Sequence, residues 1–398
     1  MNLSHNRQDL SAMRSWPLSL FVVMIMSLMI GCGGGDTNEE TSEVSSAGTT
    51  GGSNTPNDEA PNVTSEATFP VLEELDITFA EGLAHDPMSA TPFAVPLKLD
   101  MYYPDTNDTN RPVFMFIHGG GFTGGIKHKP EIVDMARYYA SRGWVFASID
   151  YRTTQELCDA ENSPPCADKL RAMTQAGPEE LVAYYRGIAP PEWLEFIIGQ
   201  MPSSFKALQQ GIANYTAQRD AKSALRWIIA NADAYGINTD YVTVGGASAG
   251  AVTTLALGIT NQEDFRDEIS IDDDPTLSTT NLSETYDVKS MVYFWGSNAK
   301  LDLFSGVYGL EQYDRYDSDD PELFMGHGTA EDPVTPYEEA LEMQEVYNDL
   351  GVYHELETLL LPNGEPAGHG AWNAQVDGKG LPELSFDFLV KRQGLNLR

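Results

Sequence analysis

The chain has 398 residues, of which 41% are hydrophobic, and 59 acidic residues oppose 24 basic ones to give a net charge of −35. This length and content allow one large hydrophobic core, or at most two domains. A surface this acidic repels the phosphates of nucleic acids and anionic lipid head groups, so we expect no nucleic-acid partner.

Residues 1–32 have the pattern of an export signal. Arg7 and Arg14 precede an apolar run over residues 16–30. The segment 28–31 (LMIG) followed by Cys32 resembles a bacterial lipoprotein cleavage box. That resemblance implies that Cys32 becomes a lipidated first residue, whose acyl chains hold the protein in the bacterial cell envelope. Ordinary secretion and an uncleaved membrane anchor remain open as alternatives.

Residues 33–67 are rich in Gly, Ser, Thr, Asn and Glu and contain no Lys or Arg. Such a segment cannot bury enough apolar surface to offset the entropy of ordering, so we expect a disordered tether. The remainder, residues 68–398, is expected to form one folded domain.

Apolar strand-like runs alternate with helical patterns along this domain, which predicts an α/β fold with a mostly parallel sheet covered by helices. In chain order the pattern predicts a strand at 97–103, a strand at 112–117, a helix at 130–141, a strand at 144–149, a helix at 213–234, a strand at 241–244, a helix at 249–257, strands at 288–295 and 323–326, a helix at 335–350, a strand at 353–361 and a helix at 380–392.

Two segments interrupt this alternation. Residues 153–207 carry several prolines and an aromatic cluster (Tyr184, Tyr185, Trp193 and Phe196), and they either cap a site and shape a substrate pocket or pack peripherally. The same segment holds Cys158 and Cys166, for which a disulfide is plausible in an exported chain, with free thiols as the alternative. Residues 261–287 are acidic and predict a surface loop, in which the acidic triplet 272–274 could bind calcium, although no regular ligand spacing follows.

Two glycine-rich strings each follow a predicted strand. Residues 246–250 read GASAG and place Ser248 between the strand 241–244 and the helix 249–257. A Gly-X-Ser-X-Gly pentad in this setting puts the serine on a sharp turn with its hydroxyl exposed as a nucleophile. Residues 118–122 read HGGGF. Backbone N–H groups of such a loop can stabilise the oxyanion that forms when the serine attacks an ester carbonyl.

We therefore expect Gly120 and Gly121 to donate to the oxyanion, with Ala249, the residue after the nucleophile, as the third donor. The serine also needs a general base. Of the seven histidines, His327 and His369 are the serious candidates, and His369 is favoured because it lies between the last predicted strand and the last helix. That position fits the chain order serine, acid, histidine.

The acid is expected in the loop that follows residues 323–326. Pro336 lies four residues beyond Asp332, a spacing that favours Asp332, whereas counting from His327 favours Glu331. A carboxylate at this position would orient the histidine and stabilise its cation. We predict a catalytic triad of Ser248, Asp332 and His369.

Five strings now support a family resemblance: residues 118–122, residues 148–152 (SIDYR), residues 246–250, the Asp332 loop and residues 368–370 (GHG). With these strings, the region from Phe69 to Arg398 resembles the α/β-hydrolase superfamily, in the carboxylesterase/lipase branch with an HGGGF oxyanion loop. The resemblance implies a serine carboxylic-ester hydrolase that works through an acyl-enzyme, with a cap-like insertion at 153–207. It also implies that Asp220 supports the oxyanion loop.

The expected partner is a small-molecule ester, with no cofactor and no metal, and the membrane is contacted only through the lipid anchor. The sequence does not predict an oligomeric state. The resemblance also allows a feruloyl or acetyl esterase acting on plant polysaccharide side chains. A catalytically inert surface binding protein with a hydrolase fold is the alternative from another functional class.

Overall fold

The computed structural model describes residues 60–89, 91–200, 204–301, 307 and 315–398. The expected signal, Cys32 and residues 33–59 of the expected tether lie outside the described residues. The end of the tether differs from expectation, because Asn62–Val63 (β1) pairs in parallel with Asn396–Leu397 (β12) and Val63 is fully buried. The ordered chain therefore begins before residue 67.

An eight-stranded sheet forms the centre of the fold, with the strand order β2-β3-β5-β4-β6-β7-β8-β9. Strand β3 pairs antiparallel with both of its neighbours, β2 and β5, and the remaining pairs are parallel, which confirms the mostly parallel sheet. The strands are β2 (Val71–Ala84), β3 (Phe93–Pro104), β4 (Arg111–Ile117), β5 (Val145–Ile149), β6 (Ile237–Ala247), β7 (Ser290–Phe294), β8 (Glu322–Gly328) and β9 (His354–Leu359). A small hairpin of β10 (Gln375–Val376) and β11 (Lys379–Gly380) follows.

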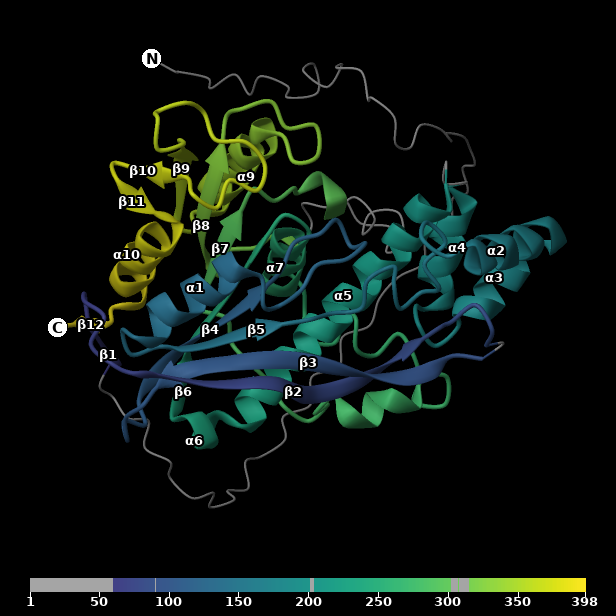
Figure 1. Ribbon diagram of the computed structural model, residues 1–398, viewed down its shortest axis with the longest axis horizontal. Coiled ribbons are helices and arrows are strands. Elements are labelled where there is room, and N and C mark those ends of the chain that lie inside the picture. Colours follow the sequence, from purple (N-terminus) through teal and green to yellow (C-terminus); the bar gives the residue numbers. More distant parts are fainter. Residues whose placement is uncertain (1–59, 90, 201–203, 302–306, 308–314) are drawn as a thin grey trace, which may run out of the picture. The chain divides into compact units, whose positions relative to one another are not determined.

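Helices cover both faces of this sheet (Figure 1). They are α1 (Pro130–Ala140), α2 (Pro164–Ala176), α3 (Pro178–Tyr185), α4 (Pro191–Gly199), α5 (Phe205–Ala230), α6 (Ala232–Tyr235), α7 (Ala249–Ile259), α9 (Tyr337–Leu350) and α10 (Leu381–Gln393), with short 3₁₀ turns η2 (Pro275–Thr279) and η3 (Ala299–Leu301).

The period-two alternation of the strands divides the core into two layers. In β4, Val113, Met115 and Ile117 face the core that contains α5 and α7. Phe114 and Phe116 face the opposite core, which is built on α1 and α10. Every residue of β4 is buried, as expected for a central parallel strand covered on both faces.

Two elements differ from the sequence expectation. The 14-residue strand β2 is not predicted, because register shifts between Glu74 and Ile77 and again between Thr78 and Ala80 break its alternation. Helix α5 begins at Phe205 rather than at residue 213, where the hydroxyl of Ser204 accepts a hydrogen bond from the N–H of Ala207 as an N-cap. Most of α5 is buried, so its sequence lacks the one-sided apolar stripe that would have marked its start.

The segment 153–207 contains the short helices α2, α3 and α4, which gather at one end of the molecule (Figure 1). Its largest aromatic side chains pack inward. Tyr185 and Trp193 are fully buried, and they donate hydrogen bonds to the carbonyls of Leu157 and Gly211. For these two side chains the structure supports the packing interpretation rather than a substrate pocket.

Cys158 and Cys166 are joined in a disulfide, as expected. The loop that it closes spans a sequence separation of 8 residues. Replacing both cysteines by serine should lower the free energy of unfolding by about 2.5 kcal/mol, because the open loop gains entropy in the unfolded chain. Denaturant unfolding with and without reductant measures this: reductant should destabilise the parent protein and leave the double variant unchanged. Equal stability of parent and variant would contradict the prediction.

None of the described helices combines the length and the apolar character needed to cross a membrane.

Candidate active site

Ser248 lies on the sharp turn between β6 and α7, the position that the sequence predicts. Its φ of +55° and ψ of −122° place a non-glycine residue in strained backbone. The flanking glycines are required by close approach: a Cβ on Gly246 would lie 2.3 Å from the Gly250 oxygen, and one on Gly250 would lie 2.0 Å from the Ile117 oxygen. The turn therefore presents the serine at the carboxyl edge of the sheet.

Three residues from distant segments meet at this turn. His369 Nε2 lies 3.0 Å from Ser248 Oγ, and His369 Nδ1 lies 2.8 Å from Asp332 Oδ2. Ser248 follows β6, Asp332 lies in the loop between β8 and α9, and His369 lies between β9 and α10. The distances suit proton transfer from the serine to the imidazole, with the carboxylate orienting the ring.

The Asp332 carboxylate is well supplied with hydrogen-bond donors. Oδ1 accepts bonds from the N–H groups of Val334 at 2.8 Å and Thr335 at 3.1 Å, and Oδ2 accepts one from the Thr335 hydroxyl at 2.7 Å. Burial opposes ionisation, but these bonds and the one from His369 outweigh it and lower the pKa of Asp332. Glu331, the alternative acid, is exposed. Asp332 is thus the carboxylate that is placed to act on His369.

The glycine loop lies directly against the serine turn. A Cβ on Gly119 would lie 2.7 Å from the Ala247 oxygen and 3.1 Å from Ser248 Cβ. Gly120 and Gly121 have φ values of +135° and +60°, which favour glycine. Ala249 is the first residue of α7, so its N–H belongs to the helix N-terminus, where amides lack intrahelical partners.

Side chains hold the two peptide planes whose N–H groups are the expected donors. The carbonyl of Gly119 accepts a hydrogen bond from His118 Nδ1 at 2.8 Å, which orients the N–H of Gly120. The carbonyl of Gly120 accepts from the N–H and the hydroxyl of Thr123, at 3.0 and 2.9 Å, which orients the N–H of Gly121. Because burial lowers the pKa of His118, its ring stays neutral and serves as a fixed donor.

A buried lysine fastens the far end of this loop. Lys127 Nζ lies 2.9 Å from Asp76 Oδ1 and 3.0 Å from Asp100 Oδ1, and its backbone N–H donates to Asp150 Oδ1 at 2.8 Å. Burial disfavours the ammonium, but its carboxylate partners outweigh that effect and raise the pKa of Lys127. Asp150 also lies 3.6 Å from His118 Nε2, so both ends of the glycine loop meet at one carboxylate.

Asp220 acts on the loop only through intermediates. Its carboxylate forms a buried ion pair with Arg152, at 2.6 Å from Nη2, and accepts the Arg152 backbone N–H at 2.8 Å. The preceding Tyr151 donates its hydroxyl to the His118 carbonyl at 3.0 Å and stacks on the His118 ring. The support that the resemblance implies for Asp220 therefore runs through Arg152 and Tyr151.

The second histidine candidate, His327, lies beside the site. Its Nδ1 is 2.9 Å from the Gly328 oxygen, and burial lowers its pKa. Thr335, Thr123 and Lys127 are the residues that sequence reasoning missed. Each is a common residue without a motif of its own, and only the fold brings it to the site.

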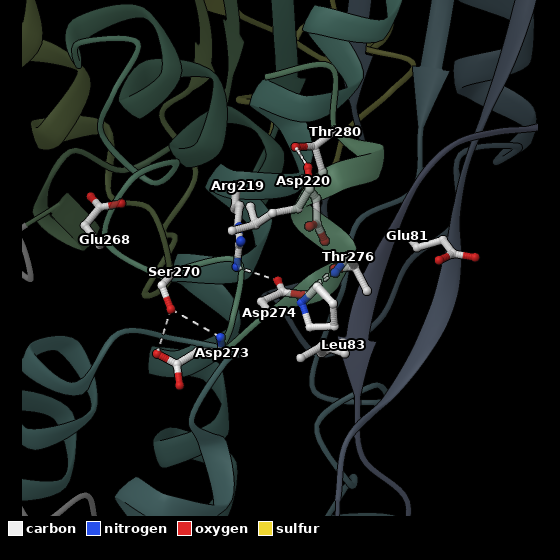
Figure 2. Close-up of polar contacts among 12 residues, drawn as sticks. Glu81, Leu83, Arg219, Asp220, Glu268, Ser270, Asp273, Asp274, Thr276 and Thr280 are labelled. Atoms are coloured by element: carbon white, nitrogen blue, oxygen red, sulfur yellow. Dashed lines mark hydrogen bonds and ion pairs between the residues drawn. The ribbon is translucent and has the colours of Figure 1, made fainter. Parts of the chain in front are cut away.

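Two of the three carboxylates in the acidic triplet, those of Asp273 and Asp274, have protein partners (Figure 2). Asp274 Oδ2 forms an ion pair with Arg219 Nη1 at 2.9 Å, and Asp273 accepts a bond from the Ser270 hydroxyl at 3.0 Å. Among the described residues no cluster of three or more His, Cys, Asp or Glu side chains could hold a metal ion. These contacts favour a loop fastened to α5 over a calcium site.

The family model BD-FAE, which describes α/β-hydrolase-type esterases, matches residues 99–167 and 206–309. No curated protein shows a significant match. A solved structure of a truncated carbohydrate esterase from gut microbiota is 16% identical, with a TM-score of 0.49 over 84% of this chain and 100% of that one. Butyrate-bound esterase Est2 of the planctomycete Thermogutta terrifontis is 19% identical, with a TM-score of 0.49 over 75% of this chain and 90% of that one.

The two matched segments carry β4, the glycine loop, β6 and the serine turn. They therefore include the strands at the centre of a mostly parallel sheet that is flanked by helices. Over these two segments the chain is similar to the BD-FAE family of esterases, and its mostly parallel sheet flanked by helices is the architecture of an α/β-hydrolase.

Proposed function

We propose that the chain hydrolyses carboxylic esters through an acyl-enzyme formed on Ser248. The Ser248 oxygen attacks the ester carbonyl carbon while His369 Nε2 takes its proton. The N–H groups of Gly120, Gly121 and Ala249 stabilise the oxyanion of the tetrahedral intermediate. The intermediate collapses, the C–O bond to the alcohol breaks, and His369 returns the proton to the departing alcohol.

Water completes the cycle by the same route. It attacks the acyl carbon, gives a proton to His369, and releases the carboxylic acid as the proton returns to Ser248. Asp332 holds the ring and stabilises the imidazolium in both half-reactions. The observation that carries the proposal is the chain of contacts from Ser248 Oγ through His369 to Asp332, at 3.0 and 2.8 Å.

The proposal predicts measurable hydrolysis of p-nitrophenyl acetate and butyrate, with kcat/KM on the order of 10⁴ M⁻¹s⁻¹ or more for the preferred ester. Methyl ferulate in the same panel tests the feruloyl alternative. Because Tyr185 and Trp193 of the insertion are buried in packing, we expect the aliphatic acyl esters to be turned over faster than the feruloyl ester. A feruloyl ester that is preferred by tenfold would reverse this assignment of substrate class.

We also propose that the protein is exported and anchored through a lipidated Cys32. Support comes from the signal-like sequence before Cys32 and from the disulfide, which persists in oxidising compartments. Detergent phase partitioning of the expressed chain and of its Cys32→Ala variant tests this. The parent should enter the detergent phase and the variant should not, and equal partitioning would contradict the anchor.

A further inference from the structure

A hydroxyl group joins the histidine and the acid at the centre of the site. Thr335 lies two residues before α9 and is 2% exposed. Its Oγ1 is 2.7 Å from Asp332 Oδ2 and 2.9 Å from His369 Nδ1. Since Nδ1 and Oδ2 are 2.8 Å apart, the three atoms form a triangle in which every side is a hydrogen-bond distance.

Counting the protons on these three groups shows which atom donates in each hydrogen bond. His369 Nδ1 must carry a proton to donate to the carboxylate, which leaves the Nε2 lone pair directed at Ser248. The threonine has one hydroxyl proton, and the ionised carboxylate can only accept. The hydroxyl therefore donates to Asp332 Oδ2, and the Nδ1–H lies between two acceptors, Oδ2 and the threonine oxygen.

We propose that Thr335 is a positioning residue that holds the His369 ring and the Asp332 carboxylate in one hydrogen-bonded triangle. By donating to the same carboxylate oxygen, it weakens the hydrogen bond between that carboxylate and the ring. The inference rests on the proposed function of the triad. Asp332 Oδ2 shares its negative charge between two donors, so its bond to Nδ1–H is weaker than it would be alone. Among the bonds that lower the pKa of Asp332, that from the Thr335 side chain has the largest effect, although burial opposes it.

Few other titratable groups face the His369 ring in the described part of the site. Ser248 lies on one side at 3.0 Å and Asp332 on the other at 2.8 Å. His327 at the end of β8 is the nearby cation candidate, and its pKa is lowered by burial, which keeps it neutral. Glu331 in the same loop is exposed and therefore screened by solvent. A shift in the pH profile of kcat/KM in a Thr335 variant therefore reflects the hydrogen bonds among Thr335, Asp332 and His369.

The test compares Thr335→Val, which keeps the shape and removes the hydroxyl, with Thr335→Ser, which keeps the hydroxyl. Thr335→Val should lower kcat/KM by about tenfold and move the acidic limb of its pH profile to higher pH by about half a unit, because the undivided carboxylate holds the ring proton more tightly. Thr335→Ser should restore both values to near those of the parent. Thr329→Val, an exposed threonine of the same loop, is the matched control and should change neither.

The Nδ1–H resonance of His369 in ¹⁵N-histidine-labelled protein gives a readout that needs no turnover. It should move downfield in Thr335→Val and stay in place in Thr335→Ser. An unchanged resonance and an unchanged acidic limb in Thr335→Val, or an equal loss at every pH in both variants, would overturn the inference. Failure of the parent to hydrolyse any ester would instead refute the proposed function, while the resonance would still decide the triangle.

Discussion

Ser248→Ala is expected to reduce kcat on p-nitrophenyl acetate by roughly 10⁵-fold or more, to the background that the glycine loop alone supports. Among the described residues, Ser248 Oγ is the hydroxyl oxygen that lies at hydrogen-bond distance from His369 Nε2. Without it, the ring has no alcohol to activate. Steady-state rates on the purified variant measure the effect, with unfolding curves to show that the fold is kept. Ser278→Ala, an exposed serine of η2, is the control and should keep the parent rate.

The acid can be tested by the same assay with two neighbouring carboxylates. Asp332→Asn should lower kcat by about 10⁴-fold, because the amide favours the wrong tautomer of His369 and cannot stabilise its cation. The kcat of Glu331→Gln should stay within about twofold of the parent value, since Glu331 is exposed and solvent screens its charge. The opposite ranking of the two variants would move the acid to Glu331.

Lys127→Met should lower the free energy of unfolding by about 3 kcal/mol, because it leaves the buried Asp100 carboxylate without its cation. Asp100 is 1% exposed and Lys127 only 2%, so water cannot replace the lost contact. Methionine keeps most of the side-chain volume, which confines the change to charge. Urea unfolding, followed by tryptophan fluorescence, gives the value.

Lys98→Met is the matched control for that variant. Lys98 lies 3.9 Å from Asp76, a carboxylate that Lys127 also contacts, but its side chain is 40% exposed. An exposed ion pair contributes about 1 kcal/mol or less, so Lys98→Met should leave the free energy of unfolding almost unchanged. Equal losses in the two variants would show that the buried lysine does not fasten the loop through these carboxylates.

Much of the central sheet and the serine turn could be predicted because local rules determine them. A continuous apolar run predicted β4 to within one residue, and Gly246 and Gly250 predicted the turn because only glycine fits against the neighbouring backbone. Placement of His369 followed from chain order, since the loops after parallel strands share one edge of a sheet.

Other features depend on contacts between distant segments, which no local pattern encodes. Strand β2 is concealed by its two register shifts. No motif marks Lys127, yet carboxylates of β2, β3 and the loop after β5 surround its side chain. The spacing to Pro336 favoured Asp332 over Glu331, but only the fold shows which carboxylate contacts His369, which lies 37 residues beyond Asp332.

Covalent labelling of the folded protein with a fluorophosphonate tests the identity of the nucleophile most directly. Such probes phosphonylate a serine oxygen only when a neighbouring base activates it. Peptide mass spectrometry should find the added phosphonyl group on Ser248, with labelling abolished in His369→Gln. A folded protein that resists the probe, or one that carries the label on another residue, would contradict the account.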